Sequence, residues 1–208
     1  RHKIGRADGR EFSPLFYEPI GEKCRRKPIH AIERLLPFLK EVGLQEYDPS
    51  LPLRFPNSHL SKELEDLIQG DGFVLLFPES RRPEKVWRHF FALGKTLSHL
   101  SHTQVVVAGN EKVGEFPGAV DLRENLGLCE LPDLINRAKV VVANDSAPLH
   151  LASALDRPLV GLFGPTECTR YGPYPLGRSK NVILQGKDGD IDSICVNSVS
   201  QAVTELNQ

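Results

Sequence analysis

The chain has 208 residues, of which 40% are hydrophobic and 25% charged, and it contains 17 glycines and 16 prolines. This composition is typical of a globular protein with a sizeable core and excludes a mainly disordered chain. No apolar run approaches the ~20 residues that a membrane span requires, and the formal net charge of −1 excludes the overall positive field of a nucleic-acid-binding protein.

The start of the chain and its cysteines bear on its origin. The chain begins at Arg1 without an apolar signal region and contains no methionine, which favours a processed or excised fragment of a longer protein. Its four cysteines lie far apart and form no CxxC pair. The pattern therefore predicts reduced thiols in a cytoplasmic protein, without a zinc site or other metal site.

The N-terminal part of the chain is polar and then helical. Residues 1–28 are rich in proline and glycine, which predicts mostly loop, and the basic cluster within residues 23–27 is interpreted as a solvated part of this loop. Apolar residues spaced by three and four over residues 32–42 predict a helix. Pro37 is expected to kink this helix and Gly43 to end it.

Three prolines within residues 48–58 predict a linker or a domain edge. Beyond it, short apolar runs alternate with stretches of helical period, which predict buried strands and amphipathic helices. Ser58 or Ser61 is the expected cap of the first of these helices. The predicted strands are residues 73–77, 104–108, 140–143, 158–163 and 181–184, and the predicted helices are residues 61–69, 86–100, 131–138, 148–155 and 193–206.

The alternation of strands and helices predicts βαβ units and hence an α/β fold. We expect a Rossmann-like parallel sheet with helices on both faces. Ligands of such sheets bind beyond the carboxyl ends of the strands, where the strand order reverses. The residues that follow each predicted strand are therefore the candidate site residues.

The segment after the predicted strand 140–143 has the features of a phosphate site. The small side chains of Ser146 and Ala147 leave the N-terminus of the next helix open to an anion, and His150 lies one turn further on. Asp145, like Ser146, is a favourable helix cap. A purely structural interpretation, in which Asp145 only caps the helix and His150 only packs, stays open.

Three cations follow the predicted strand 73–77. Arg81, Arg82 and Lys85 suit an anionic ligand. Lys85 stands just before a predicted helix, where a cation gains nothing from the helix dipole. This position favours a functional role for the lysine over simple solvation.

Two further strands are followed by polar candidates. Glu111, after residues 104–108, could accept hydrogen bonds from ribose hydroxyls, although glutamates are more often simply exposed. The long loop after residues 158–163 presents the hydroxyl of Thr166, and Gly164 there would let a ligand approach the backbone. The alternative is that this loop is only a turn-rich connector.

Several common catalytic motifs are absent from the sequence. No G-x-G-x-x-G follows the first predicted strand, which disfavours an NAD-dependent oxidoreductase. No P-loop motif and no G-x-S-x-G motif occur, which argues against a P-loop NTPase and an α/β-hydrolase.

The candidate segments resemble a known family. Residues 144–152 read N-D-S-A-P-L-H-L-A, and residues 161–166 read G-L-F-G-P-T. The pair resembles the C-terminal domain of the ADP-heptose:lipopolysaccharide heptosyltransferases, glycosyltransferase family nine, and the resemblance is firm over residues 70–175. It extends to K-x-W at residues 85–87, R-P at 157–158 and R-Y-G-P-Y at 170–174.

The resemblance implies a GT-B architecture, of which this chain would be the C-terminal, donor-binding half. It also implies inverting, metal-independent transfer of a heptose or a related sugar from an ADP-sugar to a lipopolysaccharide-type acceptor, with no further cofactor. The catalytic base of the family is a carboxylate near a glycine-rich loop of the N-terminal domain, and no such segment occurs here, so the catalytic residue is unassigned. By resemblance, Lys85 would contact the donor phosphate or sugar, Glu111 would bind the ribose and Asp145 would bind the sugar hydroxyls. The diphosphate would be surrounded by Ser146, Ala147 and His150, and Thr166 would line the same pocket.

Two positions depart from the family pattern. Ala147 stands where glycine is usual, which tightens backbone access to a phosphate. Residues 78–80, Pro-Glu-Ser, replace a small glycine-containing loop. Glu79 is expected to repel a diphosphate unless it points away or pairs with Arg81.

The resemblance also sets the expected organisation and partners. Residues 1–55 would be a remnant of an acceptor domain with a linker, residues 56–190 a donor-binding domain and residues 191–208 a C-terminal helix. The expected partners are a nucleotide-sugar donor and a saccharide or lipid-linked acceptor, and no nucleic acid. The expected location is the cytoplasm, with peripheral association at the inner membrane left open, and a non-catalytic nucleotide-binding module is the alternative function.

Overall fold

A computed structural model describes residues 3–6, 18–20, 29–44, 48, 51–68, 72–100, 104–112 and 114–207. The chain divides into two compact units. The first comprises Arg1–Ser50 with Thr169–Tyr171, and the second comprises Leu51–Cys168 with Gly172–Gln208.

The first unit contains a short parallel strand pair where the sequence predicted loop. β1 (Ile4–Arg6) pairs with β2 (Glu18–Ile20). Three-residue strands are too short to show a period of two, so the pattern could not reveal them. The basic cluster within residues 23–27 lies outside the described residues.

The predicted helix over residues 32–42 is shorter in the structure. A 3-10 turn, η2 (Glu33–Leu35), precedes α1 (Leu36–Glu41). Pro37 lies in the first turn of α1, where its missing N–H costs nothing, so it begins the helix and does not kink it. Gly43, at a φ of 87°, follows the end of the helix, which confirms the predicted stop.

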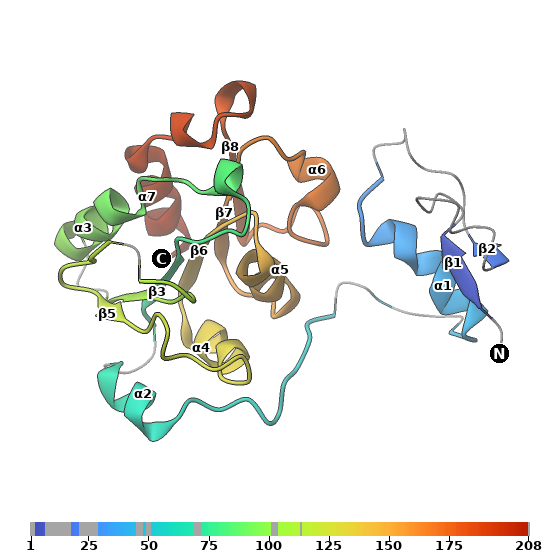
Figure 1. Ribbon diagram of the computed structural model, residues 1–208, viewed down its shortest axis with the longest axis horizontal. Helices are drawn as coiled ribbons and strands as arrows, with labels where there is room; N and C mark the ends of the chain where they lie inside the picture. Colours follow the sequence, from blue (N-terminus) through green and yellow to red (C-terminus); the bar gives the residue numbers. More distant parts are fainter. Residues whose placement is uncertain are drawn as a thin grey trace. The chain divides into compact units, whose positions relative to one another are not determined.

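The second unit is built on a six-stranded sheet in the order β5-β4-β3-β6-β7-β8, in which every pair of neighbours is parallel. This is the doubly wound Rossmann order, with the earliest of these strands in the middle of the sheet (Figure 1). β5 was not predicted because it is only two residues long. The strands are β3 (Val74–Phe77), β4 (Val105–Val107), β5 (Val120–Asp121), β6 (Val140–Asn144), β7 (Leu159–Phe163) and β8 (Asn181–Gln185).

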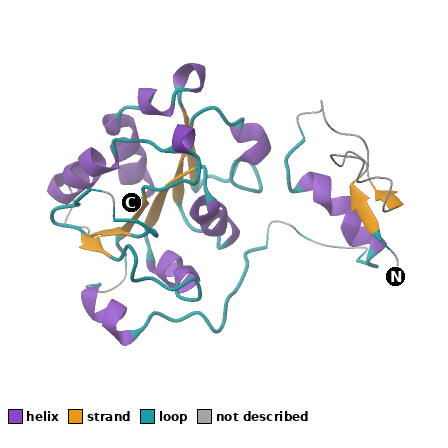
Figure 2. Ribbon diagram, viewed as in Figure 1, coloured by secondary structure: helices purple, strands orange, loops and turns teal. Residues whose placement is uncertain are grey.

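Helices cover both faces of this sheet, which confirms the predicted α/β class (Figure 2). α3 (Phe90–Leu100) and α7 (Val196–Leu206) pack on one face, and α2 (Lys62–Leu67), α4 (Leu131–Arg137) and α5 (Ala147–Ala154) pack on the other. Leu75 and Val74 belong to opposite core layers, as the strand period requires. The described residues form no helix long and apolar enough to cross a bilayer. The remaining short turns are η3 (Pro83–Lys85), α6 (Cys168–Tyr171), η4 (Lys187–Gly189) and η5 (Ile191–Ser193).

The predicted helix 86–100 begins four residues later, at Phe90. Trp87 precedes it and is fully buried, with its backbone N–H donating to Asn144 Oδ1 (3.2 Å) and its indole N–H to the Ile194 carbonyl (2.9 Å). These tertiary hydrogen bonds outweigh the local helical pattern.

Of the two predicted caps, one stands at the start of α2 and the other acts on α4. Ser61 occupies the N-cap position of α2 without a side-chain capping bond among the described atoms. The Ser58 hydroxyl instead caps α4: it accepts the Asp133 N–H at 3.0 Å and donates to the Cys129 carbonyl at 2.6 Å. Ser58 therefore ties the start of the second unit to α4 rather than to its own helix.

Candidate functional site

One buried amide joins the carboxyl ends of the two central strands, β3 and β6. Asn144 is the last residue of β6 and is fully buried. Its Nδ2 donates to the Pro78 carbonyl just after β3 (2.9 Å), and its Oδ1 accepts the Trp87 N–H (3.2 Å). The whole segment between residues 78 and 87 is thereby held over the point where the strand order reverses, which is where ligands bind in this fold.

Lys85 and Asp145 form a largely buried ion pair at this point. Lys85 Nζ lies 2.5 Å from Asp145 Oδ2, and the two side chains are only 15% and 5% exposed. Asp145 is oriented by its own N–H, which donates to the Leu162 carbonyl of β7 (3.0 Å). His150 Nε2 lies 3.8 Å from Asp145 Oδ1, with its side chain half exposed. The structure therefore brings three of the predicted site residues together.

The N-terminus of α5 begins beside this ion pair. Ser146 is its N-cap residue, and Ala147, its first residue, is exposed. The Ser146 hydroxyl donates back to the Asn144 carbonyl (3.2 Å). Asp145 pairs with Lys85 and is not the N-cap residue, so the interpretation of Asp145 as a simple cap is wrong. The positive end of the helix dipole and the Lys85 ammonium thus converge on one place.

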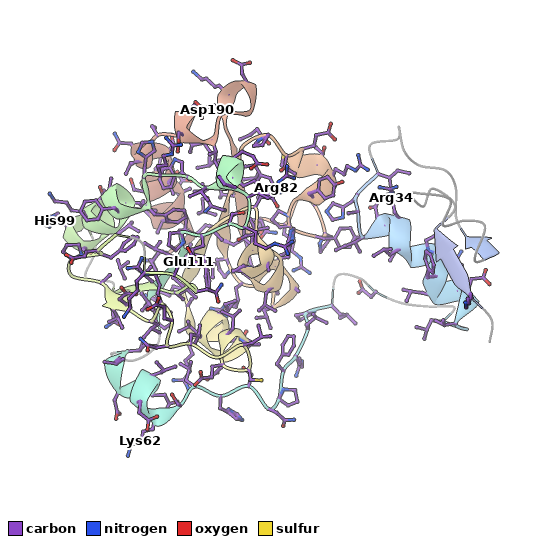
Figure 3. All side chains as sticks on the ribbon, viewed as in Figure 1. Arg34, Lys62, Arg82, His99, Glu111 and Asp190 are labelled. Atoms are coloured by element: carbon purple, nitrogen blue, oxygen red, sulfur yellow. The ribbon has the colours of Figure 1, made fainter. Side chains whose placement is uncertain are left out.

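Glu111 and Thr166 lie on the two sides of this centre. Glu111 follows β4 and Thr166 follows β7, and in the sheet these strands flank β3 and β6. Glu111 is exposed and Thr166 is half-buried. Figure 3 labels Glu111 and, at a separate place, Arg82, which follows β3. The predicted residues therefore span four adjacent strand ends.

Glu79 turns toward the loop after β4. Its Oε2 accepts the Asn110 N–H (2.9 Å) and its Oε1 accepts the Glu111 N–H (2.7 Å). We expected Glu79 to repel a diphosphate unless its side chain points away or pairs with Arg81. The side chain points toward the loop after β4, which is the first of these two arrangements. Sequence reasoning did not foresee that Glu79 would bind this neighbouring loop.

One other expectation at the strand ends is wrong. Gly164 is buried, and a Cβ atom there would lie 3.2 Å from the carbonyl oxygens of Glu84 and Gly189, so the protein's own backbone fills the space expected for a ligand. Arg82 does not join Lys85 at Asp145 but pairs with Glu84 (2.6 Å) at the surface. A hydrogen bond from the backbone of Glu84 itself, and to a smaller extent the charge of Arg82, hold the pKa of Glu84 below its usual value.

This arrangement can bind a polyhydroxyl anion. The ammonium of Lys85 and the N–H groups at the start of α5 suit phosphate oxygens, and the Asp145 carboxylate suits hydroxyl donors. Among the described residues, no group of three or more His, Cys, Asp or Glu is placed to hold a metal ion. The site residues that sequence reasoning overlooked are Asn144, whose polar side chain at the end of an apolar strand was a usable signal, and Glu79.

A doubly wound parallel sheet whose switch point carries a helix start compatible with phosphate defines a Rossmann-like α/β protein. Residues 2–196 match the family described as glycosyltransferase family 9 (heptosyltransferase). The chain belongs to this family.

Curated relatives carry the same description. The chain is 26% identical over 161 residues to lipopolysaccharide heptosyltransferase 3 of Escherichia coli, covering 70% of this chain and 47% of that protein. It is 34% identical over 169 residues to lipooligosaccharide heptosyltransferase 2 of Haemophilus influenzae, covering 76% and 42%. The chain thus spans about half the length of the relatives it matches.

A solved structure shares the fold. The E. coli heptosyltransferase WaaC with ADP matches at a TM-score of 0.68 and 22% identity, covering 92% of this chain and 61% of that one. At this identity the match shows the fold, which is that of the GT-B heptosyltransferases.

Proposed function

We propose that this chain carries the donor site of a heptosyltransferase-like glycosyltransferase, which transfers a heptose or a related sugar from an ADP-sugar to a lipopolysaccharide-type acceptor. The observation that carries the proposal is the Lys85–Asp145 pair beside the open N-terminus of α5, at the switch point of a family 9 sheet. The names of the relatives, and the ADP in the solved neighbour, support the choice of donor.

The family resemblance gives each residue a role that its chemistry can fill. Lys85 binds the donor phosphates, and Ser146, Ala147 and His150 surround them at the start of α5. Asp145 accepts hydrogen bonds from hydroxyls of the donor sugar. Glu111 accepts them from the ribose on the β4 side, and Thr166 lines the pocket on the β7 side.

Donor binding exchanges partners within the ion pair. In the structure Lys85 neutralises Asp145 at 2.5 Å. A donor diphosphate competes for the ammonium, while the sugar hydroxyls supply Asp145 with new hydrogen bonds. Because both new contacts need the intact ADP-sugar, this exchange favours the whole donor over either half of it.

The proposed chemistry is inverting displacement without a metal. The leaving diphosphate gains negative charge as the glycosidic bond breaks, and the Lys85 ammonium and the α5 N–H groups stabilise that charge. A general base must remove the proton of the acceptor hydroxyl. We assign this base to an acceptor domain.

We propose that residues 1–55 are a remnant of that acceptor domain. Residues 56–190 form the donor domain, and the C-terminal helix 191–208 completes it. We place the enzyme in the cytoplasm, with peripheral contact to the inner membrane at the site of its acceptor.

Calorimetry with the full chain tests the donor site. ADP-heptose and ADP should bind, a UDP-sugar should bind more weakly, and EDTA should leave the affinities unchanged. Arg82→Gln is the matched control, because Arg82 lies in the same loop as Lys85 but pairs with Glu84 at the surface. Absence of binding to all three ligands would falsify the donor site.

The second candidate function is a nucleotide-sugar-binding module without catalysis. The observation that favours it is the alanine at position 147, an exposed side chain at the first residue of α5 where a phosphate would approach. Transfer of heptose by the full-length protein, measured with radiolabelled donor, decides between the two. Donor binding without any transfer supports the binding module.

A further inference from the structure

We propose that Glu79 is a positioning residue, whose carboxylate fixes the loop after β4 so that Glu111 is held in place for the ribose. The inference rests on the role proposed for Glu111 above. Glu79 itself does not contact the ribose in this proposal but acts through Glu111.

The Glu79 carboxylate binds two consecutive N–H groups of the loop. Oε2 accepts from Asn110 at 2.9 Å and Oε1 accepts from Glu111 at 2.7 Å. Both oxygens are used, one for each N–H, so the contact fixes the orientation of the loop as well as its distance. Hydrogen bonds to an ionised acceptor are about twice as strong as neutral ones.

Gly109 shows that the loop and the carboxylate are fitted to each other. A Cβ atom at position 109 would lie within 3 Å of the Glu79 carboxylate oxygen Oε1. Gly109 is not among the residues with positive φ, so its backbone conformation alone does not demand glycine. A larger residue at position 109 would instead require the Glu79 carboxylate to move.

The same loop is also held by the residues that follow β5. The fully buried Arg123 donates from its guanidinium to the Gly114 carbonyl (2.8 Å), and the Glu124 N–H donates to the Gly109 carbonyl (3.0 Å). Asp121 accepts two hydrogen bonds from the Arg123 guanidinium and, with a smaller contribution from Glu79, raises the pKa of the arginine. The loop is thus anchored on both sides, and Glu79 is the anchor nearest to Glu111.

This geometry also explains how an acid can sit beside a diphosphate site. The carboxylate faces the β4 side of the switch point, where two N–H groups and the charge of Arg123 compensate it. The Lys85–Asp145 pair lies on the β6 side. Glu79 therefore serves the nucleoside end of the donor and leaves the phosphate end to Lys85.

The test compares ADP with 2′,3′-dideoxy-ADP, which lacks the ribose hydroxyls. The wild-type chain should prefer ADP about tenfold, the value of one or two hydrogen bonds to a charged acceptor. Glu79→Ala should reduce this preference to about twofold or less while the affinity for dideoxy-ADP stays within about twofold of wild type. Glu79→Gln, which keeps one acceptor oxygen, should give an intermediate preference.

Four further measurements make the result specific. Glu111→Ala should lose the same preference, and the Glu79→Ala/Glu111→Ala double variant should lose no more than either single variant. Hydrogen exchange of the Asn110 and Glu111 amides should be slow in wild type and fast in Glu79→Ala. Glu115→Ala removes an exposed carboxylate of the same segment and should change nothing.

The failures can be told apart. An unchanged preference in Glu79→Ala, with the preference lost in Glu111→Ala, overturns the positioning role alone. An equal loss of affinity for ADP and dideoxy-ADP in Glu79→Ala overturns it too, because the effect then does not pass through the ribose. A preference that survives in Glu111→Ala refutes the ribose role of Glu111 and the inference with it, and a wild-type chain that binds neither ligand refutes the proposed function.

Discussion

The two ends of α5 each carry an aspartate bound to cations, and they differ in what remains available to a ligand. At the N-terminal end, Asp145 has Lys85 at 2.5 Å. At the C-terminal end, Asp156 has Arg178 Nη1 at 2.9 Å and Lys180 Nζ at 2.8 Å. Both clusters could be taken for anion sites if only the distances between charges were counted.

The helix dipole separates the two clusters. A carboxylate at the C-terminal end of a helix is unfavourable, and the two cations at Asp156 compensate it. Arg178 also donates to the Ser153 carbonyl of the last helical turn (3.1 Å), so this cluster completes the helix end. At the N-terminal end the dipole already favours negative charge. The positive charge of Lys85 adds to this potential, which therefore favours a further anion. The comparison supports the proposal that the first cluster binds a ligand, whereas the second completes the end of the helix.

The largest expected effect comes from removing the charge at the N-terminal end. Lys85→Gln should lower sugar transfer by the full-length protein about 10²–10³-fold, since one group that stabilises the developing charge is lost. The glutamine amide can still donate to Asp145 but leaves this buried carboxylate without a counter-charge, so the unfolding free energy should fall by about 1–3 kcal/mol. Transfer kinetics and urea denaturation measure the two effects.

The matched control is at the other end of the same helix. Arg178→Gln removes a cation of similar burial and should leave transfer unchanged. An equal loss of transfer in both variants would break the distinction between the two ends.

The next effect separates the two halves of the donor. Asp145→Asn should lower the affinity for ADP-heptose about tenfold, the value of one hydrogen bond to a charged group, because the sugar hydroxyls lose an ionised acceptor. The same change frees Lys85, so the affinity for ADP alone should stay equal or rise. Calorimetry with ADP and with ADP-heptose gives both values, and a parallel fall in both affinities would contradict the assignment of Asp145 to the sugar.

The sequence was informative about elements whose signal is local. β6 and β7 are runs of five buried residues, and their apolar stretches predicted them within a residue or two. The start of α3 was predicted too early, because the buried hydrogen bonds of Trp87 join it to residues 57 and 107 positions away. A helical period cannot report partners at such separations.

The same rule applies to the candidate site. The segment from Asp145 to His150 could be found because capping, small side chains and the motif lie within a few residues. The contact between Glu79 and Glu111 could not, because its partners are 32 positions apart and meet only through the order of β3 and β4 in the sheet. Gly164 was assigned to a ligand for the same reason: the carbonyl oxygens that fill its space belong to two distant loops.

A smaller effect, confined to stability, is expected at the C-terminal end of α5. Arg178→Ala should lower the unfolding free energy by about 1–2 kcal/mol, because it removes hydrogen bonds to both Asp156 and the Ser153 carbonyl. Lys180→Ala, at a half-exposed cation, should cost only about 0.2–1 kcal/mol. Urea denaturation measures both, and the affinity for ADP should be unchanged in each. Weaker ADP binding in either variant would mean that the two ends are coupled.

The smallest effect is a pH dependence of the same cluster. The hydrogen bond from Lys180, then the charges of Lys180 and Arg178, lower the pKa of Asp156 in the folded protein. The folded state therefore binds fewer protons than the unfolded state around the ordinary aspartate pKa of about 3.9. The resulting stability is present above that pH and is lost as the pH falls through the lowered pKa of the folded state.

Asp156→Asn makes this contribution measurable. Wild type should be more stable than the variant at neutral pH by less than about 1 kcal/mol, because the Asp156 side chain is one-third exposed and the pair is screened by solvent. The difference should shrink below pH about 4, as Asp156 takes up a proton, and it should also shrink at neutral pH in about 1 M salt. If wild type and variant differ in unfolding free energy by the same amount at pH 3 and pH 7, the contribution of Asp156 does not depend on its charge. The electrostatic contrast between the two ends of α5 would then be wrong.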